Sequence, residues 1–433
     1  MKVLVSLKYI IFLLTIFSCT KDGVEDINLV QNKDIVVPEK YSALENVQPY
    51  SVPDSFPYEI SLTKVQEYGD SEDFFLSGSR SAGGMNFISS FLRFAVGGNG
   101  TVFLANNNQI EAFDTLGNHL KTLGREGRGP GEFSNFHPLF TRVSSNLVYA
   151  YDEGLKRVNI FNADSLDFSH VFPIDLRGIS NYLDIPSLHV FFNEEDLFMI
   201  SDSLALIGVR VPYQKAEHGG MKSYFIIDQE GDVVSESMIS FREHPNNSLV
   251  LLIFGKKLDY ITMPFPSDSY MKIAFDRNFN IYSSEGEEFL IKVYNSEGKY
   301  QRSIYYEFDN SEFKKEEIFE YDKYNSAKKE RAQNYDFPKV WPAVNKLFVD
   351  DKERIWVSTI TDDEEHFEWW ILKNNGALMA KFQWPGKRME RNPIAGDVSI
   401  PIVKNGFFYI SELDKATNLN KVVKYKIILE KKD

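Results

Sequence analysis

The feature that most constrains this chain is a strand–turn unit that recurs along most of its length. The clearest copy spans Phe91 to Leu123, where short apolar runs alternate with turn-forming residues. Residues 97–100 (GGNG) and 114–118 (DTLGN) carry the Gly-Asn and Asn-Gly pairs of tight hairpins. Short apolar runs between such turns are typical of β-strands. This unit therefore predicts a four-stranded antiparallel meander.

Five further units with the same order of apolar strand and polar turn follow the first. They open near Leu147, Leu197, Ile273, Leu347 and Gly406. A repeat of about 40–50 residues is typical of propeller blades, whose apolar faces are buried by stacking around an axis. The sequence therefore predicts an all-β, six-bladed β-propeller of four-stranded antiparallel blades. A β-sandwich pair or a β-helix explains the strand spacing, but not the recurrent Asp-x-x-Gly turns.

Three segments need separate interpretation. Tyr58 to Val65 alternates before the first unit, and we expect it to pair into the last blade and latch the ring. Residues 312–333 are rich in Glu, Lys and Ala, and predict a short helical insertion, either a solvated helix or a lid. The stretch from Asp175 to Thr262 fits the repeat poorly, so the boundaries of the third blade stay open.

The N-terminus has the pattern of an export signal. Residues 1–18 combine Lys2 and Lys8 with an apolar run that is shorter than the roughly 20 residues of a membrane span. Cys19, the only cysteine, follows Ser18 directly. This arrangement resembles a bacterial lipoprotein signal, in which the chain is cleaved before the cysteine and lipid is attached to it. The alternative is a free cysteine after an ordinary signal.

The expected organisation is a signal peptide at 1–18, a lipidated tether at 19–57 and the propeller at 58–433. Lys21 and Asp22 resemble the export signal of surface lipoproteins in the Bacteroidota. We therefore expect a cell-envelope protein, anchored to the outer membrane through lipid on Cys19 and exposed at the cell surface.

Composition excludes several classes of protein. A single cysteine rules out a disulfide framework and a multi-cysteine metal site. The chain has 62 Asp and Glu against 48 Lys and Arg, a net charge of −14. Nucleic-acid binding requires a basic face, so this balance argues against it.

One motif carries a resemblance to a known family. Residues 123–133 read LGREGRGPGEF, which resembles the G-x-x-G-x-G-P-G-E-F signature of NHL-like six-bladed propellers. Such propellers are widespread among lipoproteins of the Bacteroidota, and most have no assigned activity. The resemblance implies the same architecture. Related propellers include modules that bind proteins or sugars, and a few lyases and lactonases that use a central metal.

The glycine run in this motif is the first candidate site. It lacks the Lys-Ser/Thr pair of a phosphate-binding P-loop and follows a strand instead of opening a helix. We interpret it as a wide turn between blades, in which glycines adopt positive φ. Arg125, Arg128 and Glu132 would then lie near one face of the ring, where they either pair with each other or bind a ligand.

The candidate metal ligands are scattered along the chain. His137, His189 and His244 lie in different units and form no local metal motif, although a propeller could gather them at its axis. Asp152, Asp276 and Asp350 occupy turn-like positions, where they either cap backbone amides or hold calcium in the channel. No cofactor is therefore expected, and the alternative is calcium or a transition metal in the central channel.

Aromatic residues are abundant, with 35 Phe, 22 Tyr and 5 Trp, and most should pack between blades. Trp341, Trp369, Trp370 and Trp384 cluster late in the chain, either in the core or as a platform for sugar rings.

Two functions are compatible with these sequence features. The first is a lipid-anchored module that binds a protein or glycan without catalysis. The second is a metal-dependent propeller enzyme of the lyase or lactonase type.

Overall fold

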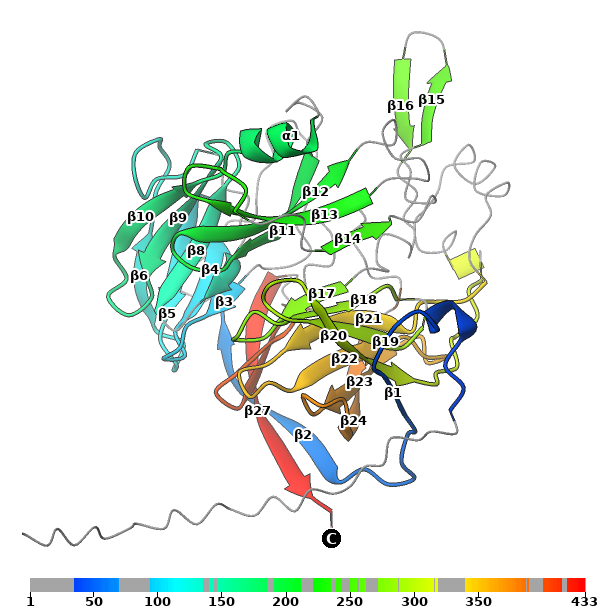
Figure 1. The fold of residues 1–433 in the computed structure, drawn as a ribbon. Helices are drawn as coiled ribbons and strands as arrows, with labels where there is room; N and C mark the ends of the chain where they lie inside the picture. The colour runs from blue at the N-terminus through cyan, green and yellow to red at the C-terminus, as the bar shows by residue number, and fades with distance from the viewer. Residues whose placement is uncertain are drawn as a thin grey trace, which may run out of the picture. The chain divides into compact units, whose positions relative to one another are not determined.

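A computed structural model describes residues 35–432 with internal gaps. These gaps are residues 70–93, 107, 135–139, 144–145, 185–190, 212–220, 235–238, 243–249, 255–256, 262–271, 287, 315, 318–338, 387, 389–399 and 415–418. The described chain is an all-β, six-bladed propeller of four-stranded antiparallel blades, as the repeats predicted (Figure 1).

Blades 1 to 3 follow one another along the chain, each as a meander in strand order. Blade 1 contains β3 (Phe94–Val96), β4 (Val102–Asn106), β5 (Gln109–Phe113) and β6 (His119–Leu123). Blade 2 contains β7 (Phe140–Val143), β8 (Leu147–Asp152), β9 (Arg157–Asn162) and β10 (Phe168–Pro173). Blade 3 contains β11 (Phe191–Met199), β12 (Leu204–Val211), β13 (Met221–Asp228) and β14 (Ile239–Arg242). A separate hairpin of β15 (Val250–Phe254) and β16 (Lys257–Ile261) follows blade 3.

Blades 4 and 5 repeat this order, and blade 6 combines both ends of the chain. Blade 4 contains β17 (Lys272–Phe275), β18 (Ile281–Ser284), β19 (Leu290–Tyr294) and β20 (Tyr300–Tyr306). Blade 5 contains β21 (Val344–Val349), β22 (Ile355–Thr359), β23 (His366–Leu372) and β24 (Leu378–Pro385). Blade 6 contains β25 (Ile402–Lys404), β26 (Phe407–Asp414), β27 (Leu419–Lys431) and β2 (Tyr58–Tyr68).

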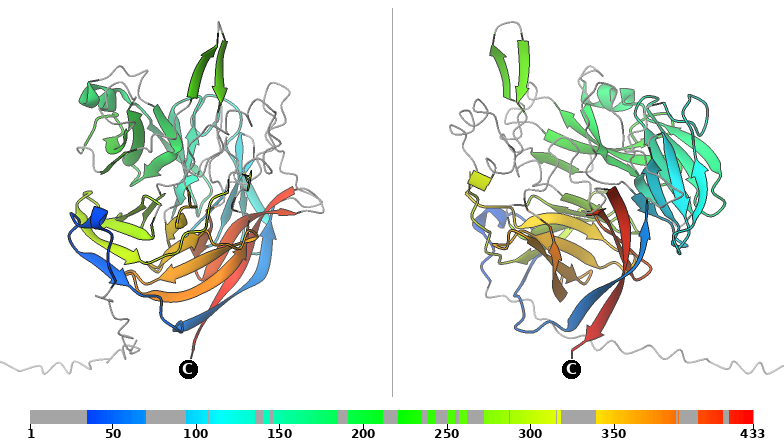
Figure 2. Two further views of the ribbon diagram at one scale, coloured as in Figure 1. Left: turned by 90° about the vertical axis from the view of Figure 1, so that its right-hand side faces the viewer. Right: turned by 180° about the vertical axis from the view of Figure 1, so that it is seen from behind.

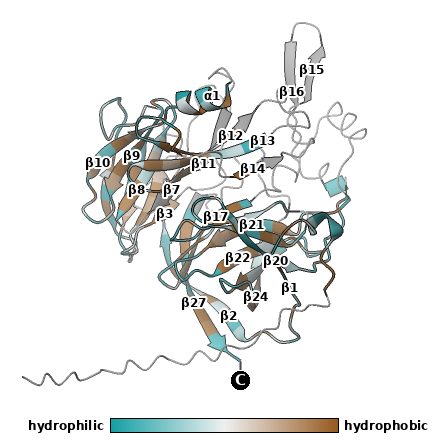
Figure 3. Cartoon of the chain, viewed as in Figure 1, coloured by the Kyte–Doolittle hydropathy of each residue, from teal (hydrophilic) through white to brown (hydrophobic). Residues whose placement is uncertain are grey.

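Apolar packing between every pair of neighbouring blades closes the ring. Buried clusters join blades 1 and 2, 2 and 3, 5 and 6, and 6 and 1. Blades 3 and 4 meet where the rings of Phe198 and Phe275 lie 4.6 Å apart, and blades 4 and 5 where Tyr306 and Trp370 lie 5.2 Å apart. The apolar residues concentrate in the strands (Figure 3). The first strands contact one another between blades 1 and 2 (β3 and β7), 2 and 3 (β7 and β11), 4 and 5 (β17 and β21), and 6 and 1 (β25 and β3), which places these strands on the inner side of the ring.

The predicted latch is confirmed. β2 runs antiparallel to β27 and forms the outer strand of blade 6, so this sheet joins an N-terminal strand to the last strand of the chain (Figure 2). Tyr68 is buried and pairs with Val422, while Tyr58 pairs with Lys431. β2 is therefore the fourth strand of blade 6, and it covers the outer edge of β27.

The chain before β2 also contacts the propeller. Residues 47–50, which the sequence analysis assigned to the tether, form β1 (Val47–Tyr50) and pair in parallel with β20 as a fifth strand of blade 4. The Tyr50 ring stacks on Tyr306, and its hydroxyl donates to the carbonyl of Asn375 in blade 5. This N-terminal arm therefore joins blades 4 and 5 before β2 reaches blade 6.

The helix predicted near 312–333 falls mainly outside the described residues, although Glu316 and Glu317 are helical. A short helix that the sequence did not indicate, α1 (Arg177–Leu183), lies between blades 2 and 3 and buries Ile179 in their shared core. None of the helices in the described part of the chain combines the length and hydropathy needed to span a membrane.

Side-chain caps close the turns within the blades, as predicted for the three aspartates. Asp276 Oδ1 accepts hydrogen bonds from the amides of Asn278 (2.8 Å) and Asn280 (3.0 Å), and Asp350 caps its own turn in the same way. Asp152 accepts from the amides of Leu155 and Ser134. Such caps satisfy backbone donors that the tight turn leaves without a strand partner.

Candidate functional site

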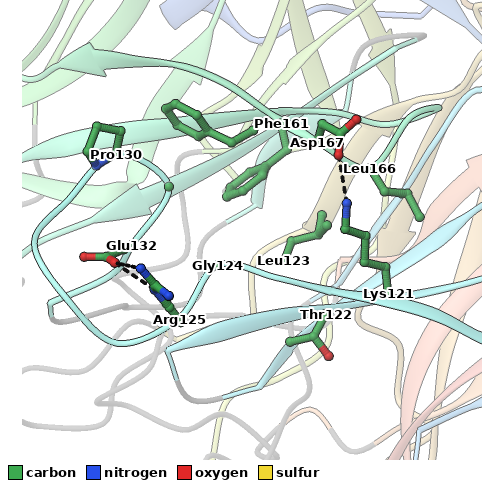
Figure 4. Close-up of a pocket in the computed structure, with 12 residues that line it drawn as sticks. Lys121, Thr122, Leu123, Gly124, Arg125, Pro130, Glu132, Phe161, Leu166 and Asp167 are labelled. Atoms are coloured by element: carbon green, nitrogen blue, oxygen red, sulfur yellow. Dashed lines mark hydrogen bonds and ion pairs between the residues drawn. The ribbon is translucent and has the colours of Figure 1, made fainter.

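A groove of about 280 Å³ lies between blades 1 and 2. One side is formed by β6 and the glycine loop (residues 124–133), and the other by the turn between β9 and β10 (Figure 4). Because β6 is the strand of blade 1 farthest from the inner strand β3, the groove lies at the outer edge of the ring. The charged residues of this loop, predicted near one face of the ring, thus lie beside a groove at its outer edge.

The glycine loop is held by its own backbone. Phe133 N donates to Arg125 O at 2.8 Å, and Gly127 N donates to Phe133 O at 3.0 Å. Gly124 has φ +75°, and a Cβ there would lie 2.4 Å from the buried Phe133 ring. A side chain at this position would therefore be both strained and obstructed. The motif folds as the wide turn between blades that we predicted, and the amides of Gly127, Gly129, Glu132 and Phe133 donate within the turn.

Two side chains of blade 2 hold the glycine loop by hydrogen bonds. Arg157 Nη2 donates to the carbonyl of Glu132 at 2.9 Å and to that of Gly129. Asn159 Nδ2 donates to the same Glu132 carbonyl at 3.1 Å. Both side chains come from β9, whose hydrogen bonds bind the loop of blade 1 to the sheet of blade 2. Sequence reasoning missed both residues, because polar positions in a strand do not reveal which loop they contact.

Arg125 and Glu132 form an ion pair at one end of the groove. Arg125 Nε and Nη2 lie 2.8 and 2.7 Å from Glu132 Oε1, and Gly129 N donates to Glu132 Oε2 at 2.7 Å. The hydrogen bond from Gly129 and the guanidinium of Arg125 lower the pKa of the Glu132 carboxyl. Arg128 is exposed on the same loop. The structure thus brings Arg125 and Glu132 together, as one of the two predicted alternatives had it.

A second ion pair closes the other end of the groove. Lys121 Nζ on β6 lies 2.8 Å from Asp167 Oδ1 in the β9–β10 turn, and this contact lowers the pKa of the Asp167 carboxyl. Leu123 and Phe161 lie between the two pairs, and Phe168 also lines the groove. Phe161 and Phe168 pack edge to face with ring centres 5.8 Å apart. The groove therefore has an apolar centre and a charged pair at each end.

The candidate metal ligands and the lipidation site are not described. His137, His189, His244 and Cys19 all lie outside the described residues. Among the residues that are described, no three His, Cys, Asp or Glu side chains gather as a metal site would require. The predicted alternative of calcium or a transition metal in the central channel therefore remains a prediction.

The late tryptophans belong to the core. Trp341, Trp369 and Trp370 are buried, and Trp384 is partly buried against Phe408 and Tyr425. Core packing, and not an exposed platform for sugars, therefore accounts for this cluster, as the first of the two predicted alternatives stated.

Residues 97–256 match the DUF5128 family, which is described as a 6-bladed beta-propeller. This stretch begins in the first turn of blade 1 and ends in the hairpin after blade 3. None of the curated proteins matches the chain. The fold and the family match together define a six-bladed β-propeller of unassigned function.

Solved structures with a similar fold include two from Bacteroides. A protein of Bacteroides fragilis described as exported is 12% identical, with 88% of this chain and 99% of that chain covered and a TM-score of 0.45. A DUF4221 family member from Bacteroides vulgatus is 13% identical, with 86% and 99% covered and a TM-score of 0.47. Virginiamycin B lyase from Staphylococcus aureus is 8% identical, with 86% and 100% covered and a TM-score of 0.34. Similarity at this level says nothing about function.

Proposed function

We propose that this protein is a lipid-anchored propeller of the cell envelope that binds a protein or glycan ligand without catalysis. The observation that carries the proposal is the groove between blades 1 and 2. Its glycine loop is fixed by hydrogen bonds within the loop and from Arg157 and Asn159, so the groove exists before any ligand arrives. A preformed site loses little conformational entropy on binding, which favours affinity.

Binding in this groove can be tested with a matched pair of aromatic substitutions. Phe168 lines the groove and is 37% exposed, while Tyr182 on α1 is 48% exposed and lies outside the groove. The soluble chain from Thr20 would be screened on arrays of glycans and of purified envelope proteins. We expect Phe168→Ala to weaken binding of a retained ligand about tenfold, since an aromatic contact of this kind contributes on the order of 1 kcal/mol or more.

Tyr182→Ala should leave that affinity within about twofold. Thermal unfolding of both variants would show whether the propeller remains intact, because Phe168 also packs on Phe161. Equal weakening by the two substitutions, or no ligand on any array, would remove the support for binding in this groove.

The anchor is proposed on the sequence pattern around Cys19. We expect the intact protein to take up radiolabelled palmitate and to sediment with the outer membrane. Cys19→Ala should abolish the label and release the chain into the soluble fraction, because acyl chains supply about 0.8 kcal/mol of membrane affinity per buried methylene. Unlabelled wild-type protein, or a Cys19→Ala variant that stays in the membrane, would contradict the lipid anchor.

A further inference from the structure

The groove contrasts with the charge of the chain around it. The chain has a net charge of −14, yet the groove itself is balanced, with the cations Lys121 and Arg125 against the carboxylates Glu132 and Asp167. Arg125 is the most open of the four ion-paired groups that line the groove, with its side chain 76% exposed. Within the described part of the chain its contacts to Glu132 use Nε and Nη2, so Nη1 can still donate to a ligand. An anionic ligand group would therefore find donors here.

The two carboxylates add a second requirement. Glu132 and Asp167 both have lowered pKa values, so at neutral pH they are ionised and act only as hydrogen-bond acceptors. Asp167 is 67% exposed, and its carboxylate contacts Lys121 through Oδ1 and also accepts from the Ser165 side chain, so its exposed surface can still accept from a ligand. A ligand that fits both kinds of group must carry hydroxyl donors as well as an anion.

The apolar centre adds a third requirement. Phe168 is 37% exposed and packs on the buried Phe161, which lies with the buried Leu123 between the two ion pairs (Figure 4). The C–H groups on one face of a sugar ring can pack against such an aromatic surface. The volume of about 280 Å³ is at the small end for ligand sites, which suits one or two sugar rings.

Resting on the proposed binding function, we infer that the groove recognises an acidic sugar, a hexuronic acid unit of a polysaccharide. The carboxylate of the sugar lies against Arg125, its hydroxyls donate to Asp167, and its C–H face covers Phe168. An acidic peptide supplies carboxylates but few hydroxyl donors for Asp167. A neutral glycan supplies hydroxyls but no anion for the exposed guanidinium of Arg125.

The inference can be tested with polygalacturonate and its methyl ester as probes, using the full soluble chain in isothermal titration calorimetry. We expect polygalacturonate to bind, and methyl esterification to weaken binding about tenfold, since a charge-assisted hydrogen bond is worth roughly 1.5–3 kcal/mol. Raising the salt concentration should also weaken binding. Arg125→Ala should weaken binding of polygalacturonate by a similar factor, because it removes the cation that contacts the carboxylate. The Arg125 side chain is exposed, so its removal should leave the fold intact.

Lys352→Ala provides the matched control, since this exposed lysine lies in the first turn of blade 5. Affinity unchanged by esterification or by Arg125→Ala would overturn the inference. Binding of poly-glutamate as tight as that of polygalacturonate would also overturn it. If a neutral glycan or a protein binds and Phe168→Ala abolishes that binding, the proposed function stands and the acidic specificity fails. If no probe or array ligand depends on Phe168, both fail.

Discussion

A chain that begins at Gly69 is expected to lose the closed ring, because it lacks β2. This strand pairs with β27 along its length, from Tyr58 opposite Lys431 to Tyr68 opposite Val422. Its removal would leave β27 as a long open edge, which is exposed to aggregation. The ring would also lose the apolar contacts that β2 makes with both neighbouring blades.

The energetic loss can be estimated from those contacts. Tyr68 is buried between blades 6 and 1, while Ile60 and Leu62 are partly buried against blade 5. Full burial of one large apolar side chain contributes about 1.5–3 kcal/mol. The loss of about 5 kcal/mol or more would be comparable to the stability of an ordinary domain. We therefore expect a chain that aggregates or unfolds without cooperativity.

Two shorter truncations serve as controls for urea unfolding followed by circular dichroism. A chain from Ile35 removes only residues that the structure does not describe, and should unfold like the full soluble form. A chain from Ser51 removes β1 with Tyr50 but keeps β2, and should lose only part of the stability. Cooperative unfolding of the Gly69 chain at the midpoint of the Ile35 chain would show that β2 does not close the ring.

The sequence predicted the parts of this fold that depend on local pattern. The hairpins of blade 1 carry their own turn residues, and β2 alternates clearly, so both were predicted with their partners. The boundaries of blade 3 could not be predicted from the sequence, because the pairing of β11 with β12 shifts register between Phe192 and Leu197 and breaks the alternation of apolar and polar residues. β1 includes Pro49 and pairs in parallel with a strand more than 250 residues away, for which no local signal exists.

The candidate site shows the same division. Arg125 and Glu132 lie seven residues apart in one motif, so their pairing was among the predicted alternatives. The opposite side of the groove comes from Asp167 and Phe168 in the next blade. Their position depends on how two sheets pack, and a single sequence does not record that packing. The groove itself therefore could not be predicted from the sequence.

Asp350→Ala is expected to cost about 3–5 kcal/mol of stability, because it would leave a buried cation without its partner. The Asp350 side chain has no exposed surface and accepts four hydrogen bonds. Two come from the amides of Lys352 and Arg354, and two come from Arg354 Nε at 2.6 Å and Trp356 Nε1 at 2.8 Å. Arg354 is itself buried, so water cannot replace the lost carboxylate.

Asp114→Ala supplies the matched control. Asp114 caps the equivalent kind of turn in blade 1 and accepts from Leu116 and Asn118, but it is only partly buried and pairs with no cation in the described structure. Its loss should cost about 1 kcal/mol, as for other side-chain caps. Urea unfolding of both variants measures the difference directly. Asp350→Asn keeps the shape of the side chain but removes the charge and turns one acceptor oxygen into a donor NH2 that faces other donors, so it should still destabilise the protein more than Asp114→Ala does. If Asp350→Asn and Asp114→Ala proved equally mild, the buried charge pair would not be what stabilises this turn.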